Sequence, residues 1–572
     1  MQHDGDRLIE SSTMDIEDIA KHGDPTDSGR AARPAQIFPR RKNQQKAPSF
    51  RRKPCADGGP AFLPETKRVY VRTFGCSHNV SDSEYMCGLL ASEGYEVSTD
   101  RADADAADAW VVNSCTVKDP SQAAFMKEVR RGMKDGKAVV VSGCIPQGER
   151  GLVKKQGGRK PPELDGASSV GIKQIGRVNE AVAAALRGET FHALGSGPLP
   201  SLELPKVRAN ALVEIVPLSS GCLGACAYCK TRHARGALGS YALADIVARV
   251  DGALADGVGE VWLSSEDTGA YGIDLGTSLG ALLEALLPVL EAHPHGMLRV
   301  GMTNPPYVLD QLEVLGRCLN HAQVYAFLHV PVQSGSDAVL AKDRMNREYT
   351  VADFRAVVDG LASRVDGGLS LMTDVICGFP GETDGDFDAT YALVEDYAFG
   401  LINISQFYAR PGTPAASMKR VHTVTVKDRS RRLSALTQTF RPYDGLVGTV
   451  VACAAHAEVA DGGARLVCHT KTYAKVLVPF DRSLVGARFE VRIDAAHRWH
   501  VDGVVLRVLR EANAAGRPAL RDALAKLDGR LARDAPKEAA APAPSSARRP
   551  GVASVLLAVL PALAAALWWS IF

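Results

Sequence analysis

The chain has 572 residues, which is long enough for three or four domains of ordinary size. The chain has 67 Lys and Arg residues against 65 Asp and Glu residues, so its net charge is only +2. This charge excludes a chain that attracts phosphate over its whole surface, and any surface that binds nucleic acid must be a local basic patch. The opening MQHDGDRLIE lacks the basic start and apolar run of a secretory signal, so we expect the 12 cysteines to be reduced thiols, metal ligands or core residues rather than disulfides.

Residues 1–65 are polar, contain prolines and become basic towards their end, which predicts a disordered basic arm. This basic run favours a solvated tail over an RNA contact. Residues 66–190 are predicted to form an open α/β domain, because strand patterns at 67–75, 109–115 and 137–144 alternate with helical segments. Such alternation is typical of a parallel sheet.

One cysteine lies at the end of, or directly after, each of these three predicted strands: Cys76, Cys115 and Cys144. The carboxyl ends of strands in an open α/β sheet line the crevice where ligands bind. We therefore expect these three thiols, although far apart in the sequence, to meet at one edge of the sheet.

A stretch rich in proline and glycine, about 190–206, separates a second region at 207–440. Strand and helix patterns alternate through this region, which predicts a partial or full βα barrel. From 441 to 508 the segments become short, alternating and bounded by turns, which predicts a small all-β barrel.

Residues 509–550 are predicted to form a linker, and the uncharged residues 551–572 a transmembrane anchor. As a helix the 22 terminal residues would span roughly 33 Å, enough to cross a bilayer. Arg548 and Arg549 precede them, and Trp568 and Trp569 lie where an aromatic belt would be. The alternative is a buried core helix.

The segment SSGCLGACAYCK at 219–230 holds Cys222, Cys226 and Cys229 in a C-x3-C-x2-C spacing. Three thiolates on one tight loop can hold three irons of a [4Fe–4S] cluster and leave the fourth iron open to a chelating cosubstrate. The alternative is a zinc knuckle, for which His233 would be the fourth ligand.

This spacing after a strand of a βα barrel resembles the radical S-adenosylmethionine superfamily, in which the open iron binds S-adenosylmethionine and reductive cleavage yields a 5′-deoxyadenosyl radical. TFGCSHN, NSCTVKDP, GCIPQ, LHVPVQSGSDAVL and TDVICGFPGETDGDF resemble the methylthiotransferase family within it. The resemblance implies that Cys76, Cys115 and Cys144 hold a second, sulfur-donating [4Fe–4S] cluster, and that a second S-adenosylmethionine donates the methyl group. It also implies that the small β-barrel is an RNA-binding TRAM domain.

SSEDTGAYGIDLGT, GMTNPPY and DVICGFPGET resemble the branch that acts on threonylcarbamoyladenosine at position 37 of tRNA, and the hydrophobic tail resembles that of its eukaryotic members. The resemblance implies a tail anchor in the endoplasmic reticulum membrane, with cytosolic catalytic domains and an unidentified electron donor. Action on isopentenyladenosine in tRNA, or a membrane-tethered iron–sulfur RNA-binding protein without catalysis, are the alternatives.

Five residues are expected near S-adenosylmethionine from the resemblance: Tyr228, Ser265, Glu266, Gln333 and Gly378. Packing explains Tyr228 equally well, a helix N-cap explains Ser265 and its neighbours, and a tight turn explains Gly378 with Gly381 and Glu382. His329 lies on the same strand segment as Gln333, and structural hydrogen bonding is its alternative.

Arg344 and Arg347 follow the LHVPVQSGS segment and are the predicted cations for the substrate's phosphate or carboxylate; a solvated helix face is the alternative. In the predicted β-barrel, cations alternate with an aromatic, as in proteins that bind single-stranded RNA. The residues are His469, Lys471, Tyr473 and Lys475. A polar strand face explains the same pattern.

Overall fold

The computed structural model describes residues 67–116, 119–148, 164–512 and 517–534. The chain divides into two compact units, residues 1–527 and 528–572, and the site discussed below lies in the first. The predicted arm at 1–65 and the predicted anchor at 551–572 lie outside the described residues.

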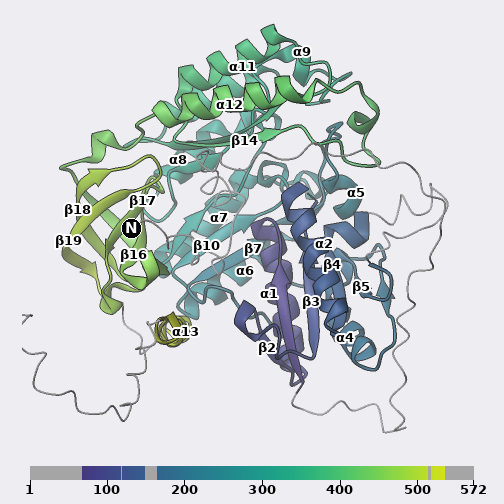
Figure 1. Cartoon of the computed structure of the whole chain (residues 1–572). Helices are drawn as coiled ribbons and strands as arrows, with labels where there is room; N and C mark the ends of the chain where they lie inside the picture. Colours follow the sequence, from purple (N-terminus) through teal and green to yellow (C-terminus); the bar gives the residue numbers. More distant parts are fainter. Residues whose placement is uncertain (1–66, 117–118, 149–163, 513–516, 535–572) are drawn as a thin grey trace, which may run out of the picture. The chain divides into compact units, whose positions relative to one another are not determined.

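The first region is a six-stranded, wholly parallel sheet in the order β2-β1-β3-β4-β5-β6 (Figure 1). The central strands β3 and β4 are buried along their whole length, as a sheet covered on both faces requires. The strands are β1 (Arg68–Thr73), β2 (Glu96–Ser98), β3 (Ala109–Ser114), β4 (Ala138–Gly143), β5 (Ser168–Val170) and β6 (His192–Ala193).

Helices cover both faces of this sheet. Alternate residues of β1 point to opposite sides, so Val69 packs with α1 (Ser77–Ser92) and α4 (Val178–Leu186), whereas Tyr70 packs with Trp110 and with Phe125 of α2 (Asp119–Lys134). This packing leaves the carboxyl ends of β1, β3 and β4 as the open edge of the layer.

The second region contains six parallel strands in two three-stranded sheets, β11-β10-β7 and β12-β13-β14. The sheets are joined by a parallel bridge between Leu298 and Val324. Pairings among the described residues do not connect β14 to β7, so the strands form a partial barrel. They are β7 (Val213–Pro217), β10 (Glu260–Ser264), β11 (Met297–Arg299), β12 (Phe327–His329), β13 (Ser370–Cys377) and β14 (Leu401–Gln406).

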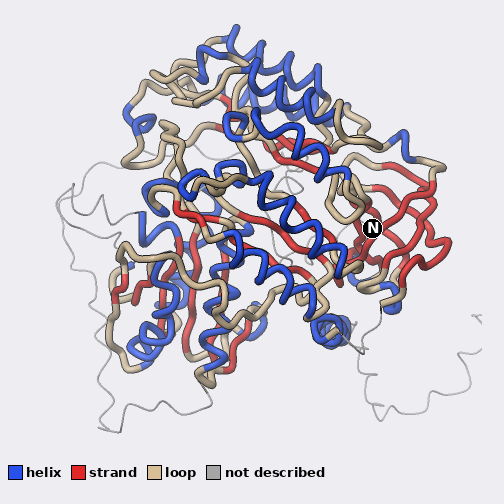
Figure 2. Tube along the Cα trace, turned by 180° about the vertical axis from the view of Figure 1, so that it is seen from behind, coloured by secondary structure: helices blue, strands red, loops and turns tan. Residues whose placement is uncertain are grey.

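Helices follow the strands of the partial barrel and cover its outer side (Figures 1 and 2). Two of them, α10 and α11, begin with a complete capping box, at Thr350 and Thr383, which satisfies otherwise unpaired backbone N–H groups. The helices are α5 (Thr231–Arg235), α6 (Leu243–Ala255), α7 (Leu279–Ala292), α8 (Leu312–Asn320), α9 (Asp337–Leu340), α10 (Val351–Ala362), α11 (Asp384–Tyr397) and α12 (Thr423–Thr439).

The third region is a closed, five-stranded barrel in the order β15-β16-β17-β19-β18. Its inward side chains, such as Val467, Val476 and Phe489, are fully buried, which is how a small barrel fills its interior. The strands are β15 (Val450–Ala460), β16 (Arg465–Thr470), β17 (Lys475–Pro479), β18 (Arg488–Ala496) and β19 (Val501–Arg510), and α13 (Pro518–Asp534) follows them.

In the described ranges, no individual helix is both long and apolar enough to span a bilayer. One bent pair, Thr268–Leu275 with Leu279–Ala292, meets the criteria of length and composition when its two halves are taken together across a bend of 102°.

Candidate active site

A cavity of about 1200 Å³ lies where the first sheet meets the partial barrel, and all six cysteines of the two predicted triplets line it. Residues at or just beyond the carboxyl ends of the barrel strands form much of its wall, including Ser265, Met302 and Pro331. Segments that are far apart in the sequence therefore bring two sets of thiols to a single chamber.

The first triplet comes from three neighbouring strand ends, because β1, β3 and β4 are adjacent in the sheet. Cys76 is the residue before α1, Cys115 directly follows β3, and Cys144 directly follows β4. Gly75 has a φ of +114°, and a Cβ there would lie 2.7 Å from the sulfur of Cys115. Only glycine permits this close approach of the Cys76 loop to Cys115.

The side chain of Asn79 joins the loops that carry these three cysteines. Its Nδ2 donates to the carbonyl oxygens of Phe74 at 3.0 Å and Ser114 at 2.8 Å. Its Oδ1 lies 3.8 Å from the sulfur of Cys144, which can donate to it. One fully buried amide thus fixes the spacing of all three strand ends.

The second triplet lies on the loop between β8 (Ser219–Ser220) and α5. A Cβ at Gly224 would lie 3.6 Å from the sulfur of Cys222 and 3.7 Å from that of Cys226, so the glycine leaves open the space between these two sulfurs. The backbone N–H of Thr231 donates to the sulfur of Cys229 at 3.4 Å.

Arg347 contacts the same loop from the far side of the cavity. Its Nη1 donates to the sulfur of Cys226 at 2.9 Å and to the hydroxyl of Tyr228 at 3.3 Å, and its Nη2 donates to Asn304. A guanidinium next to a sulfur favours the thiolate, which is the form that binds metal.

The spacing of the sulfurs distinguishes a cluster from a single zinc ion. Among the described residues, three or more His, Cys, Asp or Glu ligand atoms lie within 4.8 Å of one another only in His497, His500 and Asp502, so neither cysteine triplet is that compact. Thiolates around one tetrahedral zinc would be roughly 3.8 Å apart. A cubane cluster binds each thiolate to a separate iron, so it is compatible with sulfurs that lie farther apart than those around one zinc ion.

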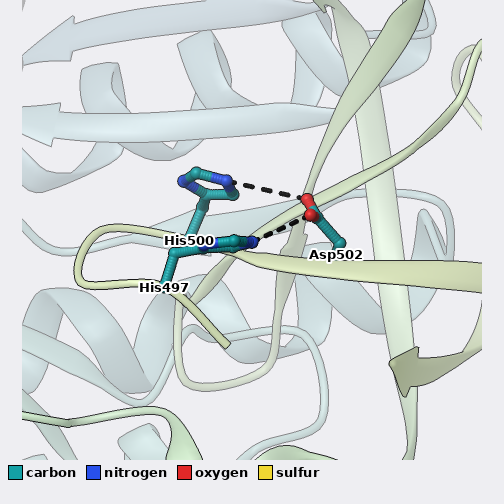
Figure 3. Close-up of side chains that lie close together, drawn as sticks. All are labelled: His497, His500 and Asp502. Atoms are coloured by element: carbon teal, nitrogen blue, oxygen red, sulfur yellow. Dashed lines mark hydrogen bonds and ion pairs between the residues drawn. The ribbon is translucent and has the colours of Figure 1, made fainter. Parts of the chain in front are cut away.

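The compact group at His497, His500 and Asp502 stabilises a hairpin (Figure 3). Nε2 of His497 lies 2.9 Å from one oxygen of Asp502, and Nε2 of His500 lies 3.6 Å from the other. Arg465 already pairs with Asp502 at 2.5 Å, so a metal ion there would lie beside a guanidinium. This arrangement favours a hydrogen-bonded turn over a metal site.

Burial raises the pKa of Cys76, Cys144 and Cys222 to about 12. The nearby Arg235 opposes the effect of burial at Cys76 and Cys144. These thiols therefore carry their protons until metal binds, and cluster assembly has to displace those protons.

Four of the five residues predicted to contact S-adenosylmethionine line the cavity: Tyr228, Ser265, Glu266 and Gln333. Gln333 has a φ of +67°, which is unusual for a residue with a side chain. Glu266 already accepts from the backbone N–H of Gly221 at 2.9 Å and pairs with Arg235 at 2.8 Å. Glu266 is thus part of the protein's internal network, and the cofactor contacts remain predictions.

Gly378 is not among the residues that line the cavity. Its φ is +76°, and a Cβ there would lie 2.3 Å from Cγ2 of Val426 on α12. Its N–H donates to Glu382 at 2.8 Å, and Glu382 pairs with Arg429 at 2.6 Å. The positive φ and the close approach of α12 explain why a glycine occupies this position. This agrees with the alternative that Gly378 shapes a tight turn.

The two arginines predicted to meet the substrate differ in where they lie. Arg344 donates to the carbonyl oxygen of Gly381 at 2.9 Å and does not line the cavity. Arg347 lines the cavity but binds Cys226 and its neighbours. Arg344 therefore lies away from the cavity, contrary to the prediction, whereas Arg347 lines it beside the cysteine loop and its contact with substrate stays a prediction.

The predicted RNA-binding set on the small barrel lies largely in an internal interface. Nζ of Lys471 donates to the carbonyl oxygens of Leu319 at 2.6 Å and His321 at 2.9 Å, and also to that of Val324. Tyr473 packs against Phe327 with ring centroids 5.2 Å apart. The expectation of RNA contact is wrong for these two residues, because their polar and aromatic groups join the barrel to the βα region.

His469 and Lys475 differ from these two in their surroundings. The ring of His469 stacks on Tyr473 at 4.3 Å, so it extends the same interface. Lys475 lies 3.7 Å from Glu458 and is partly exposed, as the polar-strand alternative expects.

Two family descriptions match the chain. "Uncharacterized protein family UPF0004" matches residues 68–160, which contain the first triplet, and "Radical SAM superfamily" matches residues 216–394, which contain the second. The threonylcarbamoyladenosine tRNA methylthiotransferase of Xenopus laevis is 43% identical over 504 residues, covering 87% of each chain. This chain belongs to the threonylcarbamoyladenosine tRNA methylthiotransferase family.

Other members of the family are similar over comparable lengths. The Homo sapiens protein of the same name is 43% identical over 499 residues, covering 86% of this chain and 83% of its own. A probable threonylcarbamoyladenosine tRNA methylthiotransferase of Pyrococcus abyssi is 36% identical over 423 residues, covering 73% of this chain and 94% of its own. The family predicted from the cysteine spacing and the barrel motifs is confirmed.

Proposed function

We propose that this chain is a radical S-adenosylmethionine enzyme that converts N6-threonylcarbamoyladenosine at position 37 of tRNA to its 2-methylthio derivative. The observation that carries the proposal is the convergence of two cysteine triplets, from two different sheets, on one cavity. Relatives that bear this activity in their names match the chain over most of its length.

The reaction explains why two clusters are needed. The C2–H bond of adenine is neither acidic nor electrophilic enough for a side chain to activate it by proton transfer, so homolytic chemistry from a cofactor is required. When bound, the cluster on Cys222, Cys226 and Cys229 would supply the 5′-deoxyadenosyl radical from S-adenosylmethionine, and the cluster on Cys76, Cys115 and Cys144 would supply sulfur. A second S-adenosylmethionine would provide the methyl group.

The chain's own residues bind and enclose these groups. Cys115 and Cys144 are buried, and Arg347 bonds to Cys226 from within the cavity wall. A chamber shielded from water protects a carbon radical and the sulfur donor from side reactions. The electron donor would approach from outside this chamber.

The small barrel supports an RNA substrate through a residue at the cavity wall. Trp499, in the hairpin between β18 and β19, lines the cavity together with Arg431 and Gln438 of α12. Arg498 fixes this hairpin by donating to the carbonyl oxygens of Thr437 at 2.8 Å and Gly400 at 2.7 Å. A partly exposed indole held in this way can stack on an unpaired base of the anticodon loop, in keeping with a TRAM domain.

The threonylcarbamoyl group carries a carboxylate, and arginines in the cavity can bind it. Besides Arg235 and Arg347, the arginines that line the cavity are Arg299, Arg410 and Arg431, and these three are the candidates. Arg299 is 4% exposed and lies over the rings of Trp262 and Tyr473, both at 4.9 Å. Such a pocket would disfavour isopentenyladenosine, whose apolar group offers a guanidinium no acceptor.

The direct test is nucleoside mass spectrometry of tRNA from cells with and without this gene. The proposal expects the 2-methylthio derivative to disappear and threonylcarbamoyladenosine to accumulate. Loss of methylthiolated isopentenyladenosine instead would favour the alternative substrate. If the chain were an iron–sulfur RNA-binding protein without catalysis, loss of the gene would change neither methylthiolated nucleoside. The purified protein would then not cleave S-adenosylmethionine under reducing, anaerobic conditions.

We also propose that residues 551–572 anchor the enzyme in the endoplasmic reticulum membrane with its catalytic domains in the cytosol. The support is the uncharged sequence itself, with Arg548 and Arg549 before it. Deleting 551–572 should release a soluble enzyme that is still active. A truncated protein that still requires detergent for extraction would contradict the anchor.

A further inference from the structure

Arg235 is a buried cation between the two cysteine triplets. It lies on α5, six residues after Cys229, and is 3% exposed. Its Nη2 donates to Asn79 at 2.7 Å and Asp82 at 2.8 Å, both on α1, and its Nε pairs with Glu266 at 2.8 Å. A side chain of the βα region thus reaches into the layer that carries the first triplet.

One nitrogen of this guanidinium is unused. Nη1 of Arg235 is buried and has no hydrogen-bond partner among the described residues, although the residue lines the cavity. An unpaired buried N–H is destabilising, so its presence calls for a group that it can bind. Asn79, which Arg235 contacts, is also the amide that joins the three cysteine loops.

The charges around this nitrogen favour an anionic partner on the side of the first triplet. Asn79 and Asp82 accept from Nη2, and Glu266 pairs with Nε. The oxygen of Asn79 that accepts from Arg235 also lies 3.8 Å from the sulfur of Cys144, so the guanidinium lies beside the first triplet. Thiolates and the sulfides of an iron–sulfur cluster are the anionic acceptors that fit.

We propose that Arg235 is a positioning residue that compensates the charge of a cluster on Cys76, Cys115 and Cys144 and raises that cluster's reduction potential. The inference rests on the two-cluster site of the proposed function. A cluster gains negative charge on reduction, so a buried cation beside it stabilises the reduced form, and hydrogen bonds to sulfur act in the same direction.

Glu266 makes the inference testable in both directions. It shares Arg235 with the first triplet, and its other oxygen accepts from the backbone N–H of Gly221, next to Cys222. Removing the negative charge of Glu266 leaves more of the positive charge of Arg235 uncompensated. Substitutions at Arg235 and Glu266 should therefore move the potential in opposite directions.

The experiment uses the full chain with Cys222, Cys226 and Cys229 changed to Ala, so that only the first triplet can hold iron. After anaerobic reconstitution, iron content and the midpoint potential of the cluster are measured by redox titration with electron paramagnetic resonance. Arg235→Gln should lower the potential, Arg235→Lys should restore most of it, and Glu266→Gln should raise it. Arg249→Gln is the matched control, because Arg249 is a partly buried arginine paired with Glu214 at 3.0 Å that does not line the cavity.

The outcomes separate this inference from the proposal beneath it. Failure of the triple-alanine protein to bind iron would overturn the second cluster, and the role of Arg235 with it. A cluster whose potential is the same in Arg235→Gln and the control would overturn the role of Arg235 alone. If Arg235→Gln loses its iron, Glu266→Gln still tests the role of Arg235. A midpoint potential that stays constant or falls in Glu266→Gln contradicts the inference.

Discussion

The Nη1 of Arg347 donates a hydrogen bond to the sulfur of Cys226 at 2.9 Å. Because a hydrogen bond from a charged donor contributes about 1.5–3 kcal/mol, Arg347→Met should slow formation of 5′-deoxyadenosine roughly 10- to 100-fold. The measurement is the rate of 5′-deoxyadenosine production by the reconstituted enzyme with dithionite.

Arg344→Met is the control for this prediction, because Arg344 lies three residues away and bonds to Gly381 outside the cavity. Its rate should stay within about twofold of the wild type, as expected for a partly exposed side chain away from the site. Equal losses in the two variants would mean that Arg347 acts through the local fold and not through the sulfur.

Iron content tests the assignment of the six cysteines. Two clusters should give about eight irons per chain after anaerobic reconstitution. Changing Cys222, Cys226 and Cys229 to Ala should remove about half of the iron and abolish 5′-deoxyadenosine. Changing Cys76, Cys115 and Cys144 should also halve the iron but leave uncoupled cleavage of S-adenosylmethionine. A wild-type protein that never exceeds four irons would show that the second assignment is wrong.

Trp499 should contribute to binding of the tRNA and not to cleavage of the cofactor. Stacking of one base on an aromatic ring is worth about 1–3 kcal/mol, so Trp499→Ala should raise the KM for tRNA roughly 5- to 100-fold, and Trp499→Phe should restore most of the affinity. Production of 5′-deoxyadenosine without tRNA should not change. A KM for tRNA that is unaffected in Trp499→Ala would remove this residue from the RNA site.

The fold and the site differ in how much of them could be predicted from the sequence. The meeting of Cys76, Cys115 and Cys144 was expected, because each follows a strand and parallel strands end at a common edge. The contacts of Arg235 with Asn79 and Asp82 could not be predicted, because they join residues more than 150 positions apart. Asn79 lies inside the TFGCSHN motif, and this motif is the one local signal in the sequence for Asn79.

The wrong prediction of RNA contact at Lys471 and Tyr473 also has a physical cause. Lys471 and Tyr473 alternate along the chain as in a nucleic-acid-binding surface, but the same alternation suits an interface between two domains. A short strand pattern contains no information about which face another domain covers. Only the contact of Lys471 with the carbonyl end of α8 shows that this ammonium is used inside the protein.

Glu214 predicts a specific dependence of stability on pH. Burial alone would raise the pKa of Glu214, but Lys206, Arg249 and Arg208 outweigh burial and hold the pKa at about 2, below the ordinary 4.5. A lowered carboxyl pKa stabilises the fold above pH 4.5, and this contribution, on the order of 3 kcal/mol, is lost as the pH falls from about 4.5 to 2.

The test of that prediction is the free energy of unfolding from denaturant titrations at several pH values. Glu214→Gln should be less stable than the wild type at pH 7, and the difference between the two proteins should shrink as the pH falls below 4.5. A difference that stays constant over this range would show that folding does not lower the pKa of Glu214.

Substrate preference tests the central claim most directly. The reduced, reconstituted enzyme is supplied with S-adenosylmethionine and with one of two tRNAs, bearing threonylcarbamoyladenosine or isopentenyladenosine at position 37, and the methylthio product is measured by mass spectrometry. The account predicts product from the threonylcarbamoyl tRNA and at least tenfold less from the isopentenyl tRNA, because the isopentenyl group offers the cavity's arginines no acceptor. Preference for the isopentenyl tRNA, or product from neither while the clusters still cleave S-adenosylmethionine, would contradict it.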